Sequence, residues 1–466
     1  MKTRVEIDNY NTKLEASDWR FSAAIYGLIQ YFTYHDIEFK EDYNNDCILY
    51  NSEDITEERY LKFVENRYKE EFHHKDIENI LSKEELSDED IKIVNTKLSA
   101  NKIMEKIFKK IKANKENKKE ILDLIDKNRN EIIKETFRRT SNMYDNYANK
   151  YQLFNEKQKF CRLLGYSIDV GKKGKSTGFN FNTNAFVGQD DIEMDFVIFS
   201  FNGDRESFFI NDNSTIENIE KTNNSFKSKI LNDLKDLNKE TKIKRARYSL
   251  FKGIIESSDF INRDVEVIIK NRDNGYFETL YLRKESIDIF KNFTKCNISY
   301  KDLCTSHKVT DKYYIDVEKV VTDSIVNNIY LDNLIETLLK GDRGLLVSQL
   351  IKVNQLIRGG KNMNEKLKGA YKCAKQVSAF MKEKKLENKI DTYKQKLTSA
   401  IIFKDYDRVY QILLQLSNYV DIEFGFVYDL YDDFEENKDL VYTFINALSK
   451  NPNKELNNNK EMKENE

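Results

Sequence analysis

Two hydrophobic periods alternate along this chain. In residues 1–159, and again from about Asp316, apolar residues recur every three or four positions, which is typical of amphipathic helices. Between Phe160 and Tyr314 the spacing falls to two, as in GFNFNTNAF, MDFVIFSF, DVEVIIK and YFETLYLR, which indicates β-strands. The pattern predicts an α+β protein with a helical N-terminal region, a β-rich central domain and a C-terminal antiparallel helical bundle.

The same pattern gives the expected domain boundaries. The last residues, NPNKELNNNKEMKENE, have no apolar face and are expected to be disordered. We predict a mostly helical domain 1–159, a β-rich domain 160–315 that carries a basic loop, a helical bundle 316–450 and a disordered tail 451–466.

Several elements can be predicted individually. Ser17 is placed to cap a buried helix whose apolar residues begin at Phe21. The segment NRDNG, Asn271–Gly275, suits a hairpin turn because Asn and Gly tolerate a positive φ. Short loops separate four amphipathic segments, which predicts antiparallel helices over Leu345–Ile357, Met363–Lys384, Asn388–Phe403 and Tyr406–Val420.

The composition indicates a folded, cytoplasmic protein. Of its 466 residues 39% are hydrophobic, and no run approaches the roughly 18 apolar residues of a membrane span, so no membrane partner is expected. The five cysteines are few and widely separated, which argues against a disulfide framework.

The net charge of −2 conceals strongly basic segments. Residues 221–252 carry 10 Lys and Arg against 3 acidic residues, and residues 340–408 carry 17 against 7. Basic residues can neutralise phosphates by releasing counterions, although solvated helix faces have the same composition. The candidate nucleic-acid-binding residues in these segments are Lys244, Arg245, Arg247, Lys368, Lys372, Lys375, Lys384 and Lys385.

The loop DVGKKGKSTGFNFN, Asp169–Asn182, resembles a phosphate-binding loop but lacks its context. Asp169 stands where the first glycine of G-x-x-x-x-G-K-[ST] belongs, and a strand pattern follows Ser176 where a helix is needed. Nucleotide hydrolysis is therefore not expected. Its lysines and amides suit a phosphodiester backbone and base edges, while an ordinary surface loop is the alternative. The candidate nucleic-acid-binding residues here are Lys172, Lys173, Lys175, Ser176, Asn180, Asn182 and Asn184.

Catalytic and metal motifs are weak, and no catalytic residue is predicted. Asp264, Glu266 and Lys270 resemble part of a metal-dependent nuclease, but that pattern places the lysine two residues after the glutamate, and here the separation is four. Cys296, Cys304 and His307 supply three possible zinc ligands without a paired C-x-x-C, so satisfied core residues are the favoured interpretation.

Several stretches together resemble the large subunit of a type I-B CRISPR interference complex (Cascade), from the family named for a CXXC-CXXC motif. The similar stretches follow the expected order and span almost the whole chain: SDWRFSAAIYGLI, FCRLLGYSIDVGKKGKSTGFNF, MDFVIFSFNGDRESFFIND, DVEVIIKNRDNGYFETLYLRK and NKIDTYKQKLTSAIIFKDYDRVYQILLQL. The chain departs from that family at Cys161, which Arg162 and two leucines follow, so the motif gives no support for zinc and no cofactor is expected.

The resemblance implies a non-catalytic subunit that reads the protospacer-adjacent motif on target double-stranded DNA, promotes R-loop formation and recruits a helicase-nuclease. The implied partners are CRISPR RNA and the backbone and small subunits of Cascade. It also implies that a small subunit can be made by internal translation, for which Met363 is the conventional start, and Leu345 or Val347 alternative ones. A metal-dependent nuclease using Asp264 and Glu266 is the alternative function, and a helical scaffold without DNA contact is a third.

Overall fold

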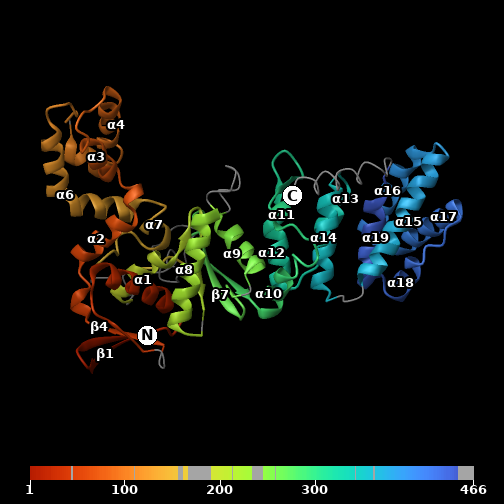
Figure 1. The fold of residues 1–466 in the computed structure, drawn as a ribbon, viewed down its shortest axis with the longest axis horizontal. Helices are drawn as coiled ribbons and strands as arrows, with labels where there is room; N and C mark the ends of the chain where they lie inside the picture. The colour runs from red at the N-terminus through yellow and green to blue at the C-terminus, as the bar shows by residue number, and fades with distance from the viewer. Residues whose placement is uncertain are drawn as a thin grey trace, which may run out of the picture. The chain divides into compact units, whose positions relative to one another are not determined.

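Two compact units make up the chain. The computed structural model describes residues 1–42, 46–109, 111–155, 161–165, 190–212, 214–233, 245–257, 259–341, 343–359 and 363–449. Helices dominate and the paired strands of these residues are antiparallel, which confirms the predicted α+β class (Figure 1). None of the helices in the described ranges is long and apolar enough to cross a membrane. Unit 1 comprises Met1–Gly253 and Asp264–Leu282, and unit 2 comprises Ile254–Arg263 and Arg283–Glu466.

Unit 1 begins with a small sheet that the sequence pattern does not predict. The strands lie in the order β1-β2-β4-β3. In β2 the alternate residues Tyr10, Thr12 and Leu14 are buried, whereas β1 is largely exposed and therefore lacks a clear period of two. The strands are β1 (Lys2–Ile7), β2 (Tyr10–Glu15), β3 (Lys40–Asp42) and β4 (Cys47–Tyr50).

The predicted buried helix is α1 (Trp19–His35), but its N-cap is Asp18. The Asp18 side chain accepts hydrogen bonds from the backbone N–H groups of Arg20 and Phe21. Ser17 is not the cap, because its hydroxyl oxygen instead accepts a 2.8 Å hydrogen bond from the amino group of Met1. The predicted cap was therefore wrong by one residue.

The segment MDFVIFSF, predicted as a strand, is instead helical. Ile192–Ser200 forms the 3₁₀ helix η5, and every side chain from Glu193 to Ser200 is buried. A short segment that is buried all round has no period that separates strand from helix, which explains the error. Helix η5 packs on α1 so closely that a Cβ at Gly27 would lie 2.2 Å from the carbonyl oxygen of Phe196.

A second sheet in unit 1 contains the predicted hairpin. Its strands lie in the order β5-β6-β7-β8, and β7 and β8 match DVEVIIK and YFETLYLR. The turn between them closes without a positive φ at any residue of Asn271–Gly275, so the hairpin was right but its expected turn chemistry was not. Lys270 holds the turn by donating to the backbone oxygens of Asn271 and Asn274. The strands are β5 (Asn202–Gly203), β6 (Glu206–Asn211), β7 (Val265–Asn271) and β8 (Phe277–Leu282).

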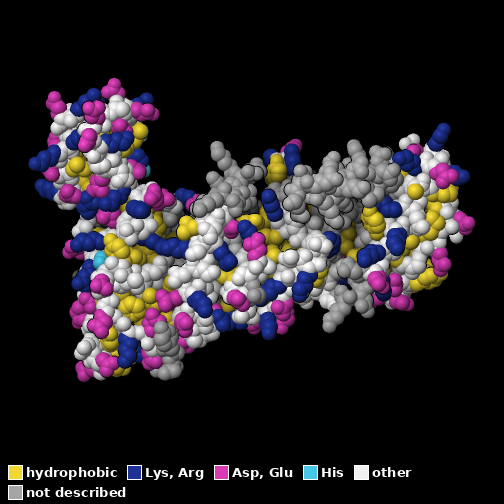
Figure 2. Space-filling model, viewed as in Figure 1, with side chains coloured by type: hydrophobic (Ala, Val, Ile, Leu, Met, Phe, Trp, Pro, Cys, Tyr) yellow, Lys and Arg dark blue, Asp and Glu magenta, His cyan; other side chains and the backbone are white. Residues whose placement is uncertain are grey.

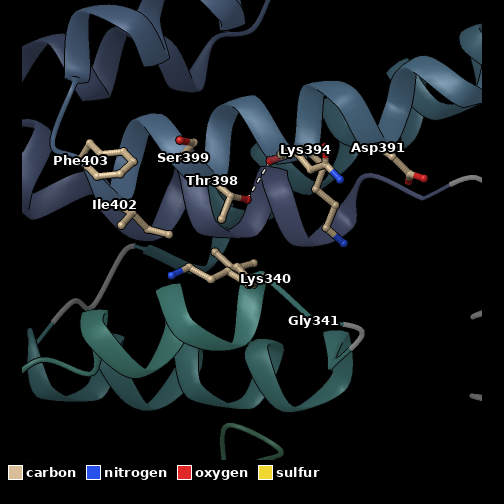
Figure 3. A pocket seen from close by; sticks show the side chains of 10 residues that line it. Lys340, Gly341, Asp391, Lys394, Thr398, Ser399, Ile402 and Phe403 are labelled. Carbon is tan, nitrogen blue, oxygen red and sulfur yellow. Dashed lines mark hydrogen bonds between the residues drawn. The ribbon is translucent and has the colours of Figure 1, made fainter. Parts of the chain in front are cut away.

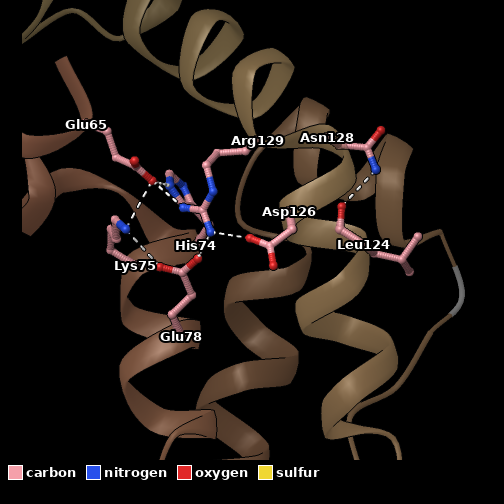
Figure 4. Close-up of polar contacts among 8 residues, drawn as sticks. All are labelled: Glu65, His74, Lys75, Glu78, Leu124, Asp126, Asn128 and Arg129. Atoms are coloured by element: carbon pink, nitrogen blue, oxygen red, sulfur yellow. Dashed lines mark hydrogen bonds and ion pairs between the residues drawn. The ribbon is translucent and has the colours of Figure 1, made fainter. Parts of the chain in front are cut away.

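The remaining helices of unit 1 lie within the predicted helical domain 1–159 or follow it, and those between His73 and Arg139 surround a second apolar core. Figure 4 shows how Arg129 of α6 reaches Glu65 of α2 and Glu78 of α3. Although burial opposes the change, the hydrogen bond from His74 and the charge of Arg129 lower the pKa of Glu65 to about 2. The helices are η1 (Ser52–Asp54), α2 (Glu57–Arg67), η2 (Lys69–Glu71), α3 (His73–Leu81), α4 (Asp88–Leu98), α5 (Lys102–Phe108), α6 (Lys118–Arg139), α7 (Tyr144–Tyr147), α8 (Ile216–Asp233) and α9 (Arg245–Glu256).

In unit 2, all four predicted C-terminal helices are present. Each begins and ends within one residue of the predicted position. Helix α19 is the centre of this bundle, because it contacts α13, α14, α15, α16 and α18. The elements are α10 (Lys284–Lys291), α11 (Tyr300–Leu303), β9 (Ser306–Lys308), β10 (Tyr314–Asp316), α12 (Val317–Asn327), α13 (Asp332–Leu339), α14 (Gly344–Ile357), α15 (Met363–Glu383), α16 (Glu387–Ile402), α17 (Tyr406–Val420), α18 (Phe426–Asp432) and α19 (Phe434–Ala447).

A buried polar cluster joins α13, α14 and α19. Asn354 donates to Asp439 at 3.0 Å and to Asp332 at 2.9 Å. Arg358 forms an ion pair with Asp439 at 3.4 Å, and its guanidinium lies 3.9 Å from the centre of the Tyr330 ring. Burial raises the pKa of Asp439 to about 6, although Asn354 and Arg358 oppose this change. The fully buried Asp439 thus depends on two residues of α14 and its C-terminal end.

Candidate nucleic-acid interface

Helix α15 carries a stripe of lysines on one face. Lys368, Lys372, Lys375 and Lys382 are spaced by four, three and seven residues, so they project from the same side of the helix. All are exposed except Lys375, which is half-buried and lies 5.3 Å from the centre of the Tyr371 ring. The opposite side of α15 is buried and packs on α19, with Ala370, Ala374, Val377 and Met381 in the core.

Further cations continue from the end of this helix into the next one. Lys384 and Lys385 are exposed and form the turn between α15 and α16, where Lys385 has a φ of 56°. Cations at a helix C-terminus also stabilise the helix dipole, which gives these two residues a structural role as well. Lys389 begins the exposed face of α16 and lies 5.4 Å from the Tyr419 ring centre.

Aromatic rings accompany these lysines. Tyr371 is 45% exposed and Tyr419 42% exposed, and each lies beside a lysine of the stripe or its continuation. Lysines can neutralise phosphates, while exposed rings can stack on bases, and single-stranded nucleic acids are bound through this combination. The arrangement on α15 and α16 can therefore follow a polynucleotide without reading its sequence.

Two lysines of unit 2 outside the stripe form ion pairs with acidic residues. Lys366, just before the stripe, forms a 2.7 Å ion pair with Asp429 of α18. Lys438 pairs with Glu435 at 2.6 Å. Figure 2 shows basic and acidic side chains interspersed over the face in view.

The other candidate residues have different positions. The loop residues Lys172, Lys173, Lys175, Ser176, Asn180, Asn182 and Asn184 lie outside the described residues, as do Lys244 and the side chain of Arg245. Arg247 is only 5% exposed and forms an ion pair with Glu206 at 3.6 Å. Its guanidinium cannot reach a phosphate on the surface, so Arg247 is removed from the candidate interface.

The structure describes both flanks of the basic loop, residues 161–165 and 190 onward. Arg162 donates through its backbone N–H to the carboxylate of Asp190 at 2.5 Å, so residues on either side of the loop are joined. Burial raises the pKa of Asp190 to about 6, against the opposing hydrogen bond and charge of Arg162.

Asp195 of η5 binds Arg162 and two further residues near this junction. It accepts hydrogen bonds from the Tyr144 hydroxyl at 2.5 Å, from Phe154 N–H at 2.9 Å and from the Arg162 guanidinium at 2.8 Å. Both Asp195 and Arg162 are almost completely buried. Sequence reasoning missed this cluster because its members are separated by up to 51 residues and no local pattern connects them.

Two residues of the alternative nuclease, Glu266 and Lys270, make separate contacts. Glu266 accepts a 2.8 Å hydrogen bond from Asn211, whereas the buried Lys270 amino group binds the turn oxygens and lies 3.3 Å from the Asn146 side-chain oxygen. Burial lowers the pKa of Lys270 to about 8. Lys270 therefore supports the hairpin.

The possible zinc ligands of unit 2 are also separate. The Cys304 thiol donates to the backbone oxygen of Tyr300 at 3.2 Å, and His307 is a strand residue opposite Ile315. Across the described ranges, no group of three His, Cys, Asp or Glu side chains could hold a metal ion.

Comparison with known proteins decides the family. The model of the family "CRISPR-associated protein Csx8" matches residues 10–448, which is nearly the whole chain. The chain belongs to this family. No curated protein and no solved structure matches it. The protein is therefore CRISPR-associated, and the Csx8 match includes both units and the lysine stripe of α15.

Proposed function

We propose that this Csx8-family protein is the non-catalytic large subunit of a type I-B-like CRISPR interference complex. In this role it reads a protospacer-adjacent motif on duplex DNA, promotes R-loop formation and recruits a helicase-nuclease. Its partners are CRISPR RNA together with the backbone and small subunits. In RNA-guided systems base pairing reads the target, while protein reads a short duplex motif and holds displaced strands.

The lysine stripe of α15, in a chain of a CRISPR-associated family, is the observation that carries this proposal. A subunit that holds a displaced strand needs exposed cations on a rigid element, and α15 presents them opposite a face packed in the core. The ordered sequence resemblance to the Cascade large subunit supports the more specific assignment.

Neutralising the stripe is the direct test. Replacing Lys368, Lys372 and Lys375 by glutamine should weaken binding to single-stranded DNA of any sequence and reduce the salt slope of log Kd by about 2–3. A matched control replaces three exposed lysines of unit 1, Lys92, Lys119 and Lys127, and should leave the slope unchanged. Equal slopes for the two triple variants, measured by fluorescence anisotropy at several salt concentrations, would contradict a role for α15.

The basic loop gives an independent prediction for duplex recognition. Replacing Lys172, Lys173 and Lys175 by alanine should weaken binding to all duplexes, because phosphate contacts carry no sequence information. Replacing Asn180 or Asn182 should instead relax motif preference by about 1–3 kcal/mol per lost base contact. Binding to a panel of duplexes with different adjacent motifs separates the two effects, and unchanged affinity of the triple lysine variant would remove the loop from the proposal.

A cleavage assay tests the proposed lack of catalysis. The purified protein alone is incubated with plasmid and Mg²⁺ or Mn²⁺. Sustained cleavage that is abolished by Asp264→Ala would favour the metal-dependent nuclease instead.

A further inference from the structure

A pocket of about 570 Å³ lies between α13 and α16, within unit 2. One wall is the end of α13 with Leu339, Lys340 and Gly341, and the other is one side of α16. In Figure 3 the side chains of Lys340, Thr398 and Ile402 lie in the gap between the two helices. The volume falls within the range of about 300–1,000 Å³ that is usual for sites of small organic ligands.

Each wall of the pocket carries a lysine side chain. Lys340 ends α13, and Lys394 comes from the middle of α16, so the two amino groups belong to separate helices. Asp391 is the one acidic residue among the described lining residues, which leaves an excess of positive charge. Anionic groups such as phosphates are the ligands that these lysines favour.

An exposed aromatic ring lies at one end. Phe403 lines the pocket and is 79% exposed, the highest exposure among the large hydrophobic side chains of the described residues. A phenylalanine ring has no polar group that could form a hydrogen bond with water. Most of the Phe403 ring is nevertheless in contact with solvent in the free protein. A flat aromatic ligand stacked on Phe403 would bury that surface.

Polar groups that can contact base edges lie between the cations and the ring. The Gln395 amide and the Ser399 hydroxyl are exposed on the same side of α16 and can both donate and accept hydrogen bonds. The Thr398 hydroxyl already donates to the backbone oxygen of Lys394 at 2.7 Å. Gln395 and Ser399 are therefore the better candidates for contact with a base.

We propose that this pocket binds an unpaired segment of a single-stranded polynucleotide, with one base on Phe403, a phosphate at Lys340 and a neighbouring phosphate at Lys394. The inference rests on the proposed function and deepens it, because it adds a base-binding pocket to the track of lysines and exposed rings on α15 and α16. DNA and RNA share this chemistry, so both are included in the test.

The test measures affinity of the full-length protein for two strands of equal charge. One is a 15-nucleotide oligothymidylate and the other is the same backbone with abasic sites. The wild-type protein should bind the strand with bases about tenfold more tightly, since stacking of one base on an aromatic ring contributes about 1–3 kcal/mol. Phe403→Ala should reduce this preference several-fold, with Tyr371 and Tyr419 as the remaining exposed rings, and leave the affinity for the abasic strand unchanged.

Two control variants make the result specific. Leu345→Ala removes another exposed apolar side chain, on α14, and should leave both affinities unchanged. Lys394→Gln should weaken binding to both strands more than Lys396→Gln, which removes a lysine of the same helix that does not line the pocket. An oligouridylate tested in parallel shows whether DNA or RNA is preferred.

The outcomes separate this inference from the proposed function. A several-fold smaller base preference in Phe403→Ala would support the pocket even if the protein failed to recognise duplex DNA. An unchanged preference in Phe403→Ala, or no binding to any of the strands, would overturn the inference, whatever the duplex experiments gave.

Discussion

Replacing Asp195 by alanine is expected to lower the free energy of unfolding of unit 1 by about 3–5 kcal/mol. The change removes the acceptor of three hydrogen bonds and leaves the Arg162 guanidinium, which is 1% exposed, without its closest carboxylate. Asp195→Asn keeps the shape and one acceptor oxygen but removes the charge, so its effect should be smaller.

The measurement can be restricted to unit 1. Trp19 is the only tryptophan of the chain, and its ring centre lies 4.9 Å from that of Phe277, so its fluorescence reports unfolding of this unit alone. Urea unfolding gives the free energy from the midpoint and slope. Asp191→Ala is the matched control. The Asp191 carboxylate is 42% exposed and its ion pair with Lys2 is long, at 3.9 Å, so its removal should cost little. A midpoint for Asp195→Ala equal to that of the control would contradict the proposed role of the cluster.

The second large effect concerns the stability of a C-terminal fragment, which should depend on the residue at which the fragment begins. A fragment 331–449 should fold cooperatively, whereas a fragment 363–449 should not. The shorter fragment lacks α13 and α14, which would leave the buried Asp439 without Asn354 and Arg358 and expose the side of α19 that these helices cover. A buried carboxylate that has lost its partners costs several kcal/mol of folding free energy, and the newly exposed apolar surface of α19 adds to this cost. The sum is comparable with the total stability of a small domain.

Thermal unfolding followed by circular dichroism compares the fragments. A third fragment, 344–449, keeps Asn354 and Arg358 but lacks Asp332, and should be intermediate in stability. If an internally translated small subunit exists, mass spectrometry should find its first residue between about Leu331 and Met363, and the contacts of Asp439 favour the earlier part of that window. A cooperative transition in fragment 363–449 equal to that of 331–449 would make Met363 an acceptable start instead.

The C-terminal helices could be predicted from sequence because each has a long amphipathic repeat. In α17 the spacing of the buried residues Val409, Ile412, Leu413 and Leu416 is enough to predict the helix. Asp405 and Asp421 cap its two ends. The hairpin β7–β8 was equally clear, since two alternating segments flank a polar turn.

Other parts of the fold depend on contacts that no local pattern encodes. Helix η5 is apolar on every side because α1 and its neighbours surround it, and the same letters would suit a buried strand. For the candidate site, the lysine stripe could be predicted from spacing, but the burial of Arg247 and the pocket between α13 and α16 could not. Both result from pairing of segments far apart in sequence, such as Arg247 with Glu206.

The central position of α19 has a consequence for synthesis of the protein on the ribosome. Domains generally fold as units while the chain emerges from its N-terminal end. Helices α13 to α16 precede their common partner along the chain, so the apolar surface that α19 covers on each of them stays exposed until residue 447 has left the ribosome. A premature stop codon just before Phe434 would therefore remove only a short part of the sequence and yet leave the whole bundle open to chaperones and proteases.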